Sequence, residues 1–389
     1  MDLADATEDR AFRATLRAFL ERALAETRSL PSDPAAAVEQ SRAWQRKLYD
    51  AGYVGLAWPR AYGGQEASPV RQVIFGEECA RLGAPPLINT IGLNILGPAL
   101  IAFGSEEQKR RFLPRILRAD DLWCQGFSEP GAGSDLASLR TAAVVDGDDF
   151  VVNGQKVWTS LGPIADWCFL LVRTDRAGRA QQGISYLLMD MRSPGVRVEP
   201  LRQITRKSHF SEVFLDDVRV PRANLVGELH DGWRVAKATL SFERSGLAGV
   251  VELEKRLEEL KSLASQRRRL DDAGLRQRLA RLFVEKEALK YTGYRVLTAQ
   301  SRGVDPGPAA AIGKLAASEL RRSIMDAALD IQGPYAAIGR GNPQALDRGR
   351  WQGLFLDARA YTIGGGTSEV MRNVIAERAL GLPKSIAGG

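Results

Sequence analysis

The hydrophobic periodicity of this chain changes twice along its length, and each change marks a change of secondary structure. Up to about residue 122, apolar residues recur at helical spacing, with clusters of Pro and Gly between the runs. From about residue 123 to residue 225 they form short alternating runs rich in Val, Phe and Tyr, which predict strands. From Gly232 to the end, long runs at helical spacing return and predict a bundle. We therefore expect an N-terminal helical domain at 1–122, a central β domain at 123–225 and a C-terminal four-helix bundle domain at 226–389.

The predicted strands are separated by pairs of residues that are typical of tight turns. These pairs are Gly147-Asp148, Asn153-Gly154 and Asp216-Asp217. Short connections of this kind join antiparallel strands, whereas parallel strands need long crossovers. We therefore expect an antiparallel β-barrel or sandwich in the central domain.

Composition excludes several classes of function. The formal net charge of +7 is spread over 389 residues without a basic run interleaved with aromatic residues, which argues against nucleic-acid binding and leaves a small anionic ligand open. Three cysteines without a CxxC pair, together with two histidines, argue against a disulfide framework and a zinc site. The acidic N-terminus and the lack of a long apolar run predict a cytoplasmic protein without a membrane span.

Three segments are candidates for a binding site. In SEPGAGSD, at 128–135, Gly131 and Gly133 let the backbone approach a ligand and the flanking hydroxyl groups can bind it, although a polar surface turn has the same pattern. In NGQKVWTSLG, at 153–162, Trp158 offers an aromatic plane beside two hydroxyl groups, although the pattern alone favours a tryptophan in the core of the domain.

The third segment is TIGGGTSE, at 362–369. Three glycines before a helix start expose backbone N–H groups at the positive end of a helix, which suits a carbonyl oxygen or a phosphate. The alternative is a flexible turn between helices, capped by Thr367 or Ser368. No GxGxxG segment or Walker A lysine loop is present, so the sequence does not support a Rossmann or P-loop nucleotide site.

Together and in this order, the three segments resemble the signatures of the acyl-CoA dehydrogenase family. Two further segments, EVFLDDVRVPRANLVGE at 212–228 and GWRVAKATLSFER at 232–244, resemble that family as well, and the third segment extends to TIGGGTSEVMRNVIAERALGLP at 362–383. The resemblance covers essentially the full chain. It implies an oxidoreductase of fatty acid or steroid side-chain β-oxidation that binds FAD non-covalently. Such an enzyme removes the α proton and the β hydride of an acyl thioester and leaves a trans-2-enoyl product.

The resemblance also assigns residues to FAD. Phe127 and Ser128 would contact the isoalloxazine ring, Trp158 would lie against the ring, and Ser160 would bond near its N5. Ser134 would face either the flavin phosphate or the pantetheine side of the substrate.

The resemblance places Thr367 and Glu369 near the adenine half of FAD. The catalytic base differs between members of the family. In the medium-chain and short-chain types the glutamate precedes the glycine of a YEGT-like motif, and that position is Gly365 here. In the isovaleryl and long-chain types it lies on the first long helix of the C-terminal domain, directly before an arginine, as Glu243-Arg244 does here.

We therefore expect Glu243 to be the base and Arg244 to contact the substrate, while the backbone N–H of Gly365 polarises the thioester carbonyl. The alternative for Glu243 is a helix-surface acid paired with a neighbouring arginine.

The chain departs from the family pattern in two places. The family's Arg-Phe-Gly motif has no match, because Arg267–Arg269 precede Leu270-Asp271-Asp272, and Asp330 stands two residues before Gln332-Gly333-Pro334. The expected partners are an acyl-CoA or acyl-carrier thioester and an electron-transferring flavoprotein, in a homotetramer or an α2β2 heterotetramer. The alternatives are an FAD-supporting partner subunit and a flavin oxidase or monooxygenase.

Overall fold

The computed structural model describes residues 6–27, 31–242, 247–302, 304 and 309–383. Glu243 and Arg244, the expected base and its neighbour, lie outside the described residues. The chain divides into two compact units. Unit 1 comprises Met1–Arg22, Ser68–Ala84 and Arg244–Gly389, and unit 2 comprises Ala23–Ala67 and Pro85–Glu243. The domain bounds 1–122, 123–225 and 226–389 stay predictions.

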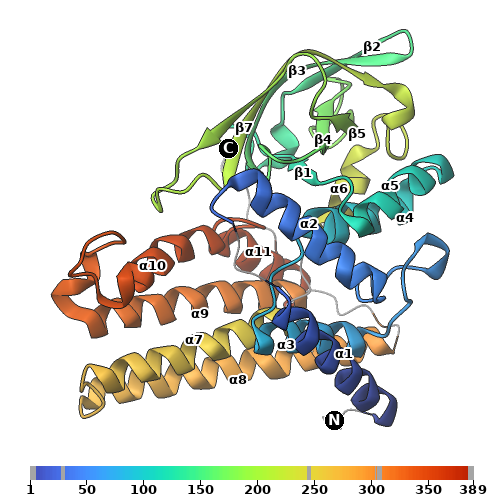
Figure 1. The fold of residues 1–389 in the computed structure, drawn as a ribbon. Coiled ribbons are helices and arrows are strands. Elements are labelled where there is room, and N and C mark those ends of the chain that lie inside the picture. The colour runs from blue at the N-terminus through green and yellow to red at the C-terminus, as the bar shows by residue number, and fades with distance from the viewer. Residues whose placement is uncertain (1–5, 28–30, 243–246, 303, 305–308, 384–389) are drawn as a thin grey trace. The chain divides into compact units, whose positions relative to one another are not determined.

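Unit 1 is helical (Figure 1). It contains most of α1 (Thr7–Ala25), α3 (Pro69–Leu82), α7 (Leu247–Gln266), α8 (Ala273–Ser301), α9 (Ala309–Gln332), α10 (Arg350–Tyr361) and α11 (Ser368–Arg378). Helices α7, α8 and α9 pack against one another, α10 and α11 pack against α9, and α3 packs against α7 and α8. The predicted C-terminal helical domain is thus confirmed.

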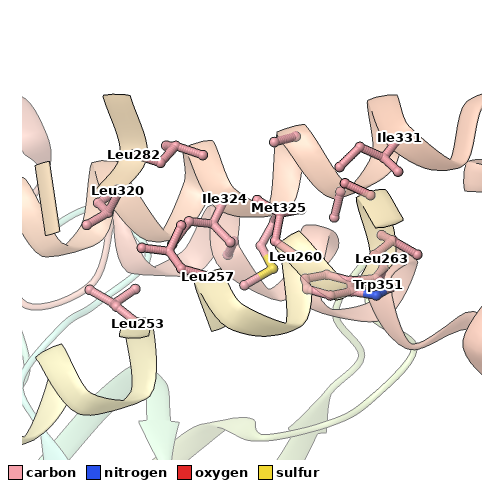
Figure 2. Packing of buried hydrophobic residues seen from close by; sticks show 14 of the residues in the cluster. Leu253, Leu257, Leu260, Leu263, Leu282, Leu320, Ile324, Met325, Ile331 and Trp351 are labelled. Atoms are coloured by element: carbon pink, nitrogen blue, oxygen red, sulfur yellow. The ribbon is translucent and has the colours of Figure 1, made fainter. Parts of the chain in front are cut away.

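The interior of unit 1 is a cluster of apolar side chains that includes one tryptophan, Trp351 (Figure 2). Leu260 of α7, Ile324 of α9 and Trp351 of α10 are at most 2% exposed. Burying a side chain of this size stabilises a fold by about 1.5–3 kcal/mol relative to leaving it in water. The apolar faces of the long helices therefore supply the driving force for the bundle that the sequence predicts.

Unit 2 combines helices with one seven-stranded sheet (Figure 1). Its principal helices are α2 (Pro34–Asp50), α4 (Gly97–Phe103), α5 (Glu106–Arg118) and α6 (Gly232–Phe242). Its strands are β1 (Trp123–Gly126), β2 (Ala142–Asp146), β3 (Asp149–Ser160), β4 (Trp167–Arg173), β5 (Ile184–Asp190), β6 (Val196–Leu201) and β7 (Phe210–Pro221). The predicted central β domain is confirmed.

The sheet is mixed, although most of its pairings are antiparallel as the sequence predicts. Strand β3 pairs with β2 and β7, and β7 pairs with β6, all antiparallel. Strand β4 pairs antiparallel with β5 along the whole length of one edge. On the other edge of β4 lie β1 and β2, which both run parallel to β4. The parallel pairing arises because the chain between β1 and β4 passes through the long loop 127–141 and the β2–β3 hairpin, which together form a crossover.

Two of the three expected turn pairs lie inside strands. Gly147-Asp148 does form the two-residue turn between β2 and β3, with Gly147 at φ +61°. Asn153-Gly154 instead lies within β3 at a register shift, opposite Asp217 within β7. The side chains of Asn153 and Asp217 bond at 2.9 Å across this irregularity. The turn-forming residues here therefore produce a bulge rather than a chain reversal.

Helix α5 packs one aromatic side chain against the beginning of the sheet. The ring of Phe112 lies edge-on to Trp123 of β1 and Trp167 of β4, with centroid separations of 5.3 and 5.0 Å. These contacts fix β1, which leads directly into the first candidate segment. Among the described residues, no helix combines the length and the apolar character that crossing a bilayer requires.

Candidate functional site

The first candidate segment leaves β1 with a rigid backbone. The ring of Phe127 is buried edge-on to Phe169 and Tyr186, at 5.6 and 5.9 Å between centroids. The carbonyl oxygen of Ser128 accepts a hydrogen bond of 2.9 Å from the N–H of Val157 in β3. The backbone of residues 127 and 128 is therefore fixed against the second candidate segment.

A buried ion pair joins these two segments, and sequence reasoning missed it. Lys156 of β3 is fully buried, and its ammonium donates to Glu129 Oε1 at 2.8 Å. Burial lowers the pKa of Lys156 to about 8, although the carboxylate of Glu129 opposes this shift. Burial alone would raise the pKa of Glu129, but the neighbouring Lys156 outweighs it and lowers that pKa. A signal existed, because Lys156 falls on the inward-facing side of a strand whose other inward residues include Phe150 and Val152.

Trp158 presents its indole ring to the surface of unit 2. Its side chain is 58% exposed, and it lies edge-on to Phe210 of β7 at 5.9 Å between ring centroids. Its φ of +59° lies in the left-handed region, which is unfavourable for a bulky residue. Trp158 is therefore not a core residue. Ser160, which pairs with Phe210, is only partly buried.

The loop that carries Ser134 is an exposed polar turn closed at its base. Ser134, Gly131 and Gly133 are exposed, and a Cβ atom at either glycine would meet nothing within 4 Å. The carboxylate of Glu129 accepts hydrogen bonds from the backbone N–H groups of Arg140 and Thr141, at 2.7 and 2.8 Å. The loop thus projects from a fixed base and offers a hydroxyl group to solvent.

The third candidate segment lies in unit 1, between α10 and α11. Gly365 and Gly366 have φ values of +66° and +96°, which favour glycine. The hydroxyl of Thr367 accepts a hydrogen bond of 3.1 Å from the N–H of Val370, so Thr367 is the N-cap of α11. Glu369 is exposed in the first turn of that helix, where bonds to its own backbone N–H and to the Thr367 hydroxyl lower its pKa.

The described residues thus place the candidate site residues in two groups. Phe127, Ser128, Ser134, Trp158 and Ser160 belong to unit 2, whereas Gly365, Thr367 and Glu369 belong to unit 1. In unit 2 an exposed indole plane, two partly buried hydroxyl groups and a rigid backbone occur close together along paired segments. This set of donors is suited to a flat heteroaromatic ring with polar edges, such as a flavin.

Two glutamates on α7 are already paired with arginines. Glu252 binds both Arg321 and Arg256, and Glu259 binds Arg350 and Arg256 at 2.7 Å. Burial alone would raise the pKa of Glu252 and of Glu259, but the hydrogen-bonded arginines outweigh it and lower both values. A carboxylate bound in this way is a poor proton acceptor at neutral pH.

The residues that depart from the family pattern have local partners. Arg269 binds Asp272 at 2.9 Å, the guanidinium of Arg267 lies 5.9 Å from the ring centroid of Tyr335, and Arg278 binds Asp330. Arg267, Arg268 and Arg269 are exposed, so the arginine run is a solvated surface feature.

Comparison with known proteins relates the whole chain to one family. Three models of acyl-CoA dehydrogenases match it: the N-terminal domain over residues 6–120, the middle domain over 124–218 and the C-terminal domain over 230–380. The chain is 43% identical over 386 residues to the acyl-CoA dehydrogenase IpdE1 of Mycobacterium tuberculosis, covering 97% of this chain and 98% of that protein.

Two solved structures share the fold over nearly the full chain. The ChsE4-ChsE5 complex from Mycobacterium tuberculosis matches with a TM-score of 0.83 and 34% identity, covering 99% of this chain and 100% of that one. The Tcur3481-Tcur3483 steroid ACAD matches with a TM-score of 0.84 and 30% identity, with the same coverage. The matched domains follow the helical, β and helical order that the sequence predicts. The chain therefore belongs to the acyl-CoA dehydrogenase family of FAD-dependent oxidoreductases.

Proposed function

We propose that this protein dehydrogenates an acyl-CoA or acyl-carrier thioester between its α and β carbons and releases the trans-2-enoyl thioester. The observation that carries the proposal is the exposed indole of Trp158 beside Ser160, on a strand whose buried Lys156 is bonded to the segment that holds Phe127 and Ser128. An exposed aromatic plane with adjacent hydroxyl groups on a rigid support suits the ring of FAD. When bound, FAD supplies the acceptor for the β hydride.

The remaining chemistry falls to three residues of this chain. Glu243 removes the α proton, and Arg244 binds the substrate beside it. The backbone N–H of Gly365 donates to the thioester oxygen as negative charge develops there, and losing one such donor typically costs about 3 kcal/mol of transition-state stabilisation. Glu252 and Glu259 are held as ionised carboxylates of lowered pKa by their arginine partners and are poor proton acceptors, which supports a base elsewhere on this part of the chain.

A bulky, ring-containing acyl group is the substrate class that we favour over a short linear one. One similar solved structure is described as a steroid ACAD. The turn at Gly364–Gly366 carries no side chains, and the neighbouring Tyr361 and Ile363 are 45% and 65% exposed. An apolar surface beside a turn without side chains supports a wide acyl group.

We propose an assembly of four subunits, either a homotetramer or an α2β2 heterotetramer, that passes electrons to an electron-transferring flavoprotein. Both similar solved structures have two-component names, which supports a heteromer. The missing Arg-Phe-Gly motif and the pairing of Arg269 with Asp272 favour a second candidate function, an FAD-supporting partner subunit. An oxidase or monooxygenase remains the alternative chemistry.

One experiment separates these functions. The purified chain, alone and co-expressed with a related partner subunit, is assayed for bound FAD and then mixed anaerobically with acyl-CoA thioesters. Bleaching of the flavin absorbance that persists until an electron-transferring flavoprotein is added supports the dehydrogenase. FAD binding only in the presence of a partner supports the partner-subunit function, and rapid reoxidation by air supports an oxidase.

A further inference from the structure

We propose that the buried ion pair of Lys156 and Glu129 holds the proposed flavin-contacting residues of unit 2 in position. In this proposal the pair sets the backbone of Phe127 and Ser128 in register with Trp158, and so determines the affinity for FAD. The inference rests on the proposed function, because it takes these three residues as flavin contacts. Neither Lys156 nor Glu129 touches the flavin in this account.

One ammonium group connects two separate segments of unit 2. Lys156 Nζ donates to Glu129 Oε1 at 2.8 Å and to the carbonyl oxygen of Phe127 at 3.1 Å. Its own strand places Trp158 two residues further on, and Val157 N–H donates to the carbonyl of Ser128 at 2.9 Å. The two flavin-contacting segments therefore share a fixed set of bonds that begins at Lys156.

The carboxylate of Glu129 accepts hydrogen bonds from backbone groups as well as from the lysine. Its two oxygens accept the backbone N–H groups of Arg140 and Thr141, at 2.7 and 2.8 Å. The backbone of Glu129 also exchanges two hydrogen bonds of 3.0 Å with Ala132. One carboxylate thus closes the base of the loop that carries Ser134 and fixes where that loop begins and ends.

Burying an ion pair costs about as much in desolvation as the attraction returns, so such a pair is weak evidence for stability and is better explained by the geometry it imposes. Lys286, the other fully buried lysine among the described residues, makes a useful contrast. It is 2% exposed and binds the side chains of Glu254 and Glu287. The Lys156 pair additionally bonds backbone groups at three positions, as a positioning device requires.

The test compares Lys156→Met with Lys286→Met, which removes a buried ammonium from unit 1. Each variant is prepared as the wild-type protein is, with any partner subunit that it needs, and stripped of FAD. FAD is then titrated and its dissociation constant is measured from flavin fluorescence, with the fold of the apoprotein checked by circular dichroism. We expect Lys156→Met to raise the dissociation constant at least tenfold, which is about 1.4 kcal/mol. We expect Lys286→Met to lower the unfolding temperature and leave FAD affinity within about twofold of wild type.

A second variant covers the case in which Lys156→Met does not fold. Glu129→Gln preserves the shape of the side chain but removes its charge, and we expect a severalfold weaker affinity together with a changed shape of the bound-flavin absorbance bands. A purely structural pair would lower the stability of the apoprotein and leave both quantities unchanged.

The outcomes distinguish this proposal from the proposed function. If the wild type binds FAD and the folded variant binds it equally well with the same spectrum, the positioning role is wrong and the proposed function stands. If the wild type binds no FAD, alone or with a partner, both proposals fail.

Discussion

Lys314 of α9 donates hydrogen bonds to the carbonyl oxygen of Gly366 and, at 3.1 Å, to that of Tyr361. These two carbonyl groups lie at the beginning and the end of the turn that contains Gly364 and Gly365. A turn without side chains makes few contacts of its own, so one ammonium group from α9 constrains both of its ends. The direction of the Gly365 N–H, which we propose to polarise the thioester, therefore depends on a residue 51 positions earlier in the chain.

Replacing Lys314 with Met removes this constraint. We expect kcat to fall about tenfold, which corresponds to about 1.4 kcal/mol of transition-state stabilisation, with a smaller change in bound flavin. Steady-state kinetics measures the fall, and amide hydrogen exchange over residues 362–367 reports the loosened turn. Lys261→Met is the control, because Lys261 is exposed on α7 and has a 3.9 Å surface pair with Glu258. An unchanged kcat in Lys314→Met would contradict the constraint.

The glycines of this turn are not equivalent, and alanine substitution distinguishes them. Gly366 has a φ of +96°, and a Cβ atom there would lie 2.5 Å from Met371 Cε. We expect Gly366→Ala to lower the free energy of unfolding by about 1–3 kcal/mol because of backbone strain. At Gly364 a Cβ atom would lie 3.4 Å from the Ala360 oxygen, so Gly364→Ala should stay within about 0.5 kcal/mol of wild type. Thermal unfolding of the two variants side by side measures the difference, and equal stability would refute the argument.

Much of the fold followed from local patterns, and the errors arose where long-range packing decides. Periodicity predicted the helical and β regions because it reflects which face each segment buries. It could not predict that β1 runs parallel to β4, or that most of α1 and all of α3 belong to the same compact unit as the C-terminal helices, since neither follows from neighbouring residues. Asn153-Gly154 was misassigned as a turn for a similar reason. The side chain of Asn153 accepts a hydrogen bond from the backbone N–H of Asp217, which lies on a strand distant in sequence.

The candidate site, like the fold, was predicted only in part from the sequence. The motifs indicated which segments carry the chemistry, and Thr367 as a cap was one of the expected alternatives. The pattern alone favoured a core position for Trp158, and the structure shows the residue exposed, because an aromatic residue on a strand suits either environment. Glu129 and Lys314 were missed because their role consists of bonds to the backbone of other segments, and such bonds leave no periodic signal. Lys156 was missed although its inward-facing position on the strand did give a signal.

The exposed indole of Trp158 should matter to FAD more than to folding. We expect Trp158→Ala to weaken FAD binding by about 1–2 kcal/mol, since the aromatic contact is lost, and to leave the stability of the apoprotein nearly unchanged or slightly higher because the left-handed φ is less costly for a small residue. Ile204→Ala is the control, because Ile204 is 65% exposed in the same unit. Fluorescence titration with FAD measures both variants. A large loss of apoprotein stability in Trp158→Ala would instead indicate a structural role.

Glu243→Gln tests the base assignment. We expect the variant to retain FAD, because the amide has the same shape, and to lose reduction of the flavin by an acyl-CoA thioester, because the amide does not accept the α proton at neutral pH. Anaerobic stopped-flow absorbance measures the rate of bleaching, and a fall of at least a thousandfold is expected. Glu258→Gln is the matched control, since the side chain of Glu258 is 68% exposed on α7. Normal bleaching in Glu243→Gln would remove Glu243 from the mechanism.

The low pKa of Lys156 predicts opposite effects of alkaline pH on folding and on FAD binding. Burial lowers this pKa from 10.5 to about 8, and the groups that act on it are the Glu129 carboxylate and the Cys168 thiol. Between about pH 8 and pH 10.5 the unfolded chain therefore binds more protons at this residue than the folded chain, so its contribution to the free energy of unfolding rises with pH.

Loss of the proton also leaves the Glu129 carboxylate without its cation, which weakens the bonds that position Phe127 and Ser128. We therefore expect the dissociation constant for FAD to increase about threefold to tenfold between pH 7 and pH 9.5, with its midpoint near pH 8. Urea unfolding of the apoprotein and FAD titration across this range, in the wild type and in Lys156→Met, measure the two effects as differences. If Lys156 keeps its proton throughout, the difference between wild type and Lys156→Met in the free energy of unfolding and their difference in FAD affinity should both be independent of pH. That result would contradict the prediction.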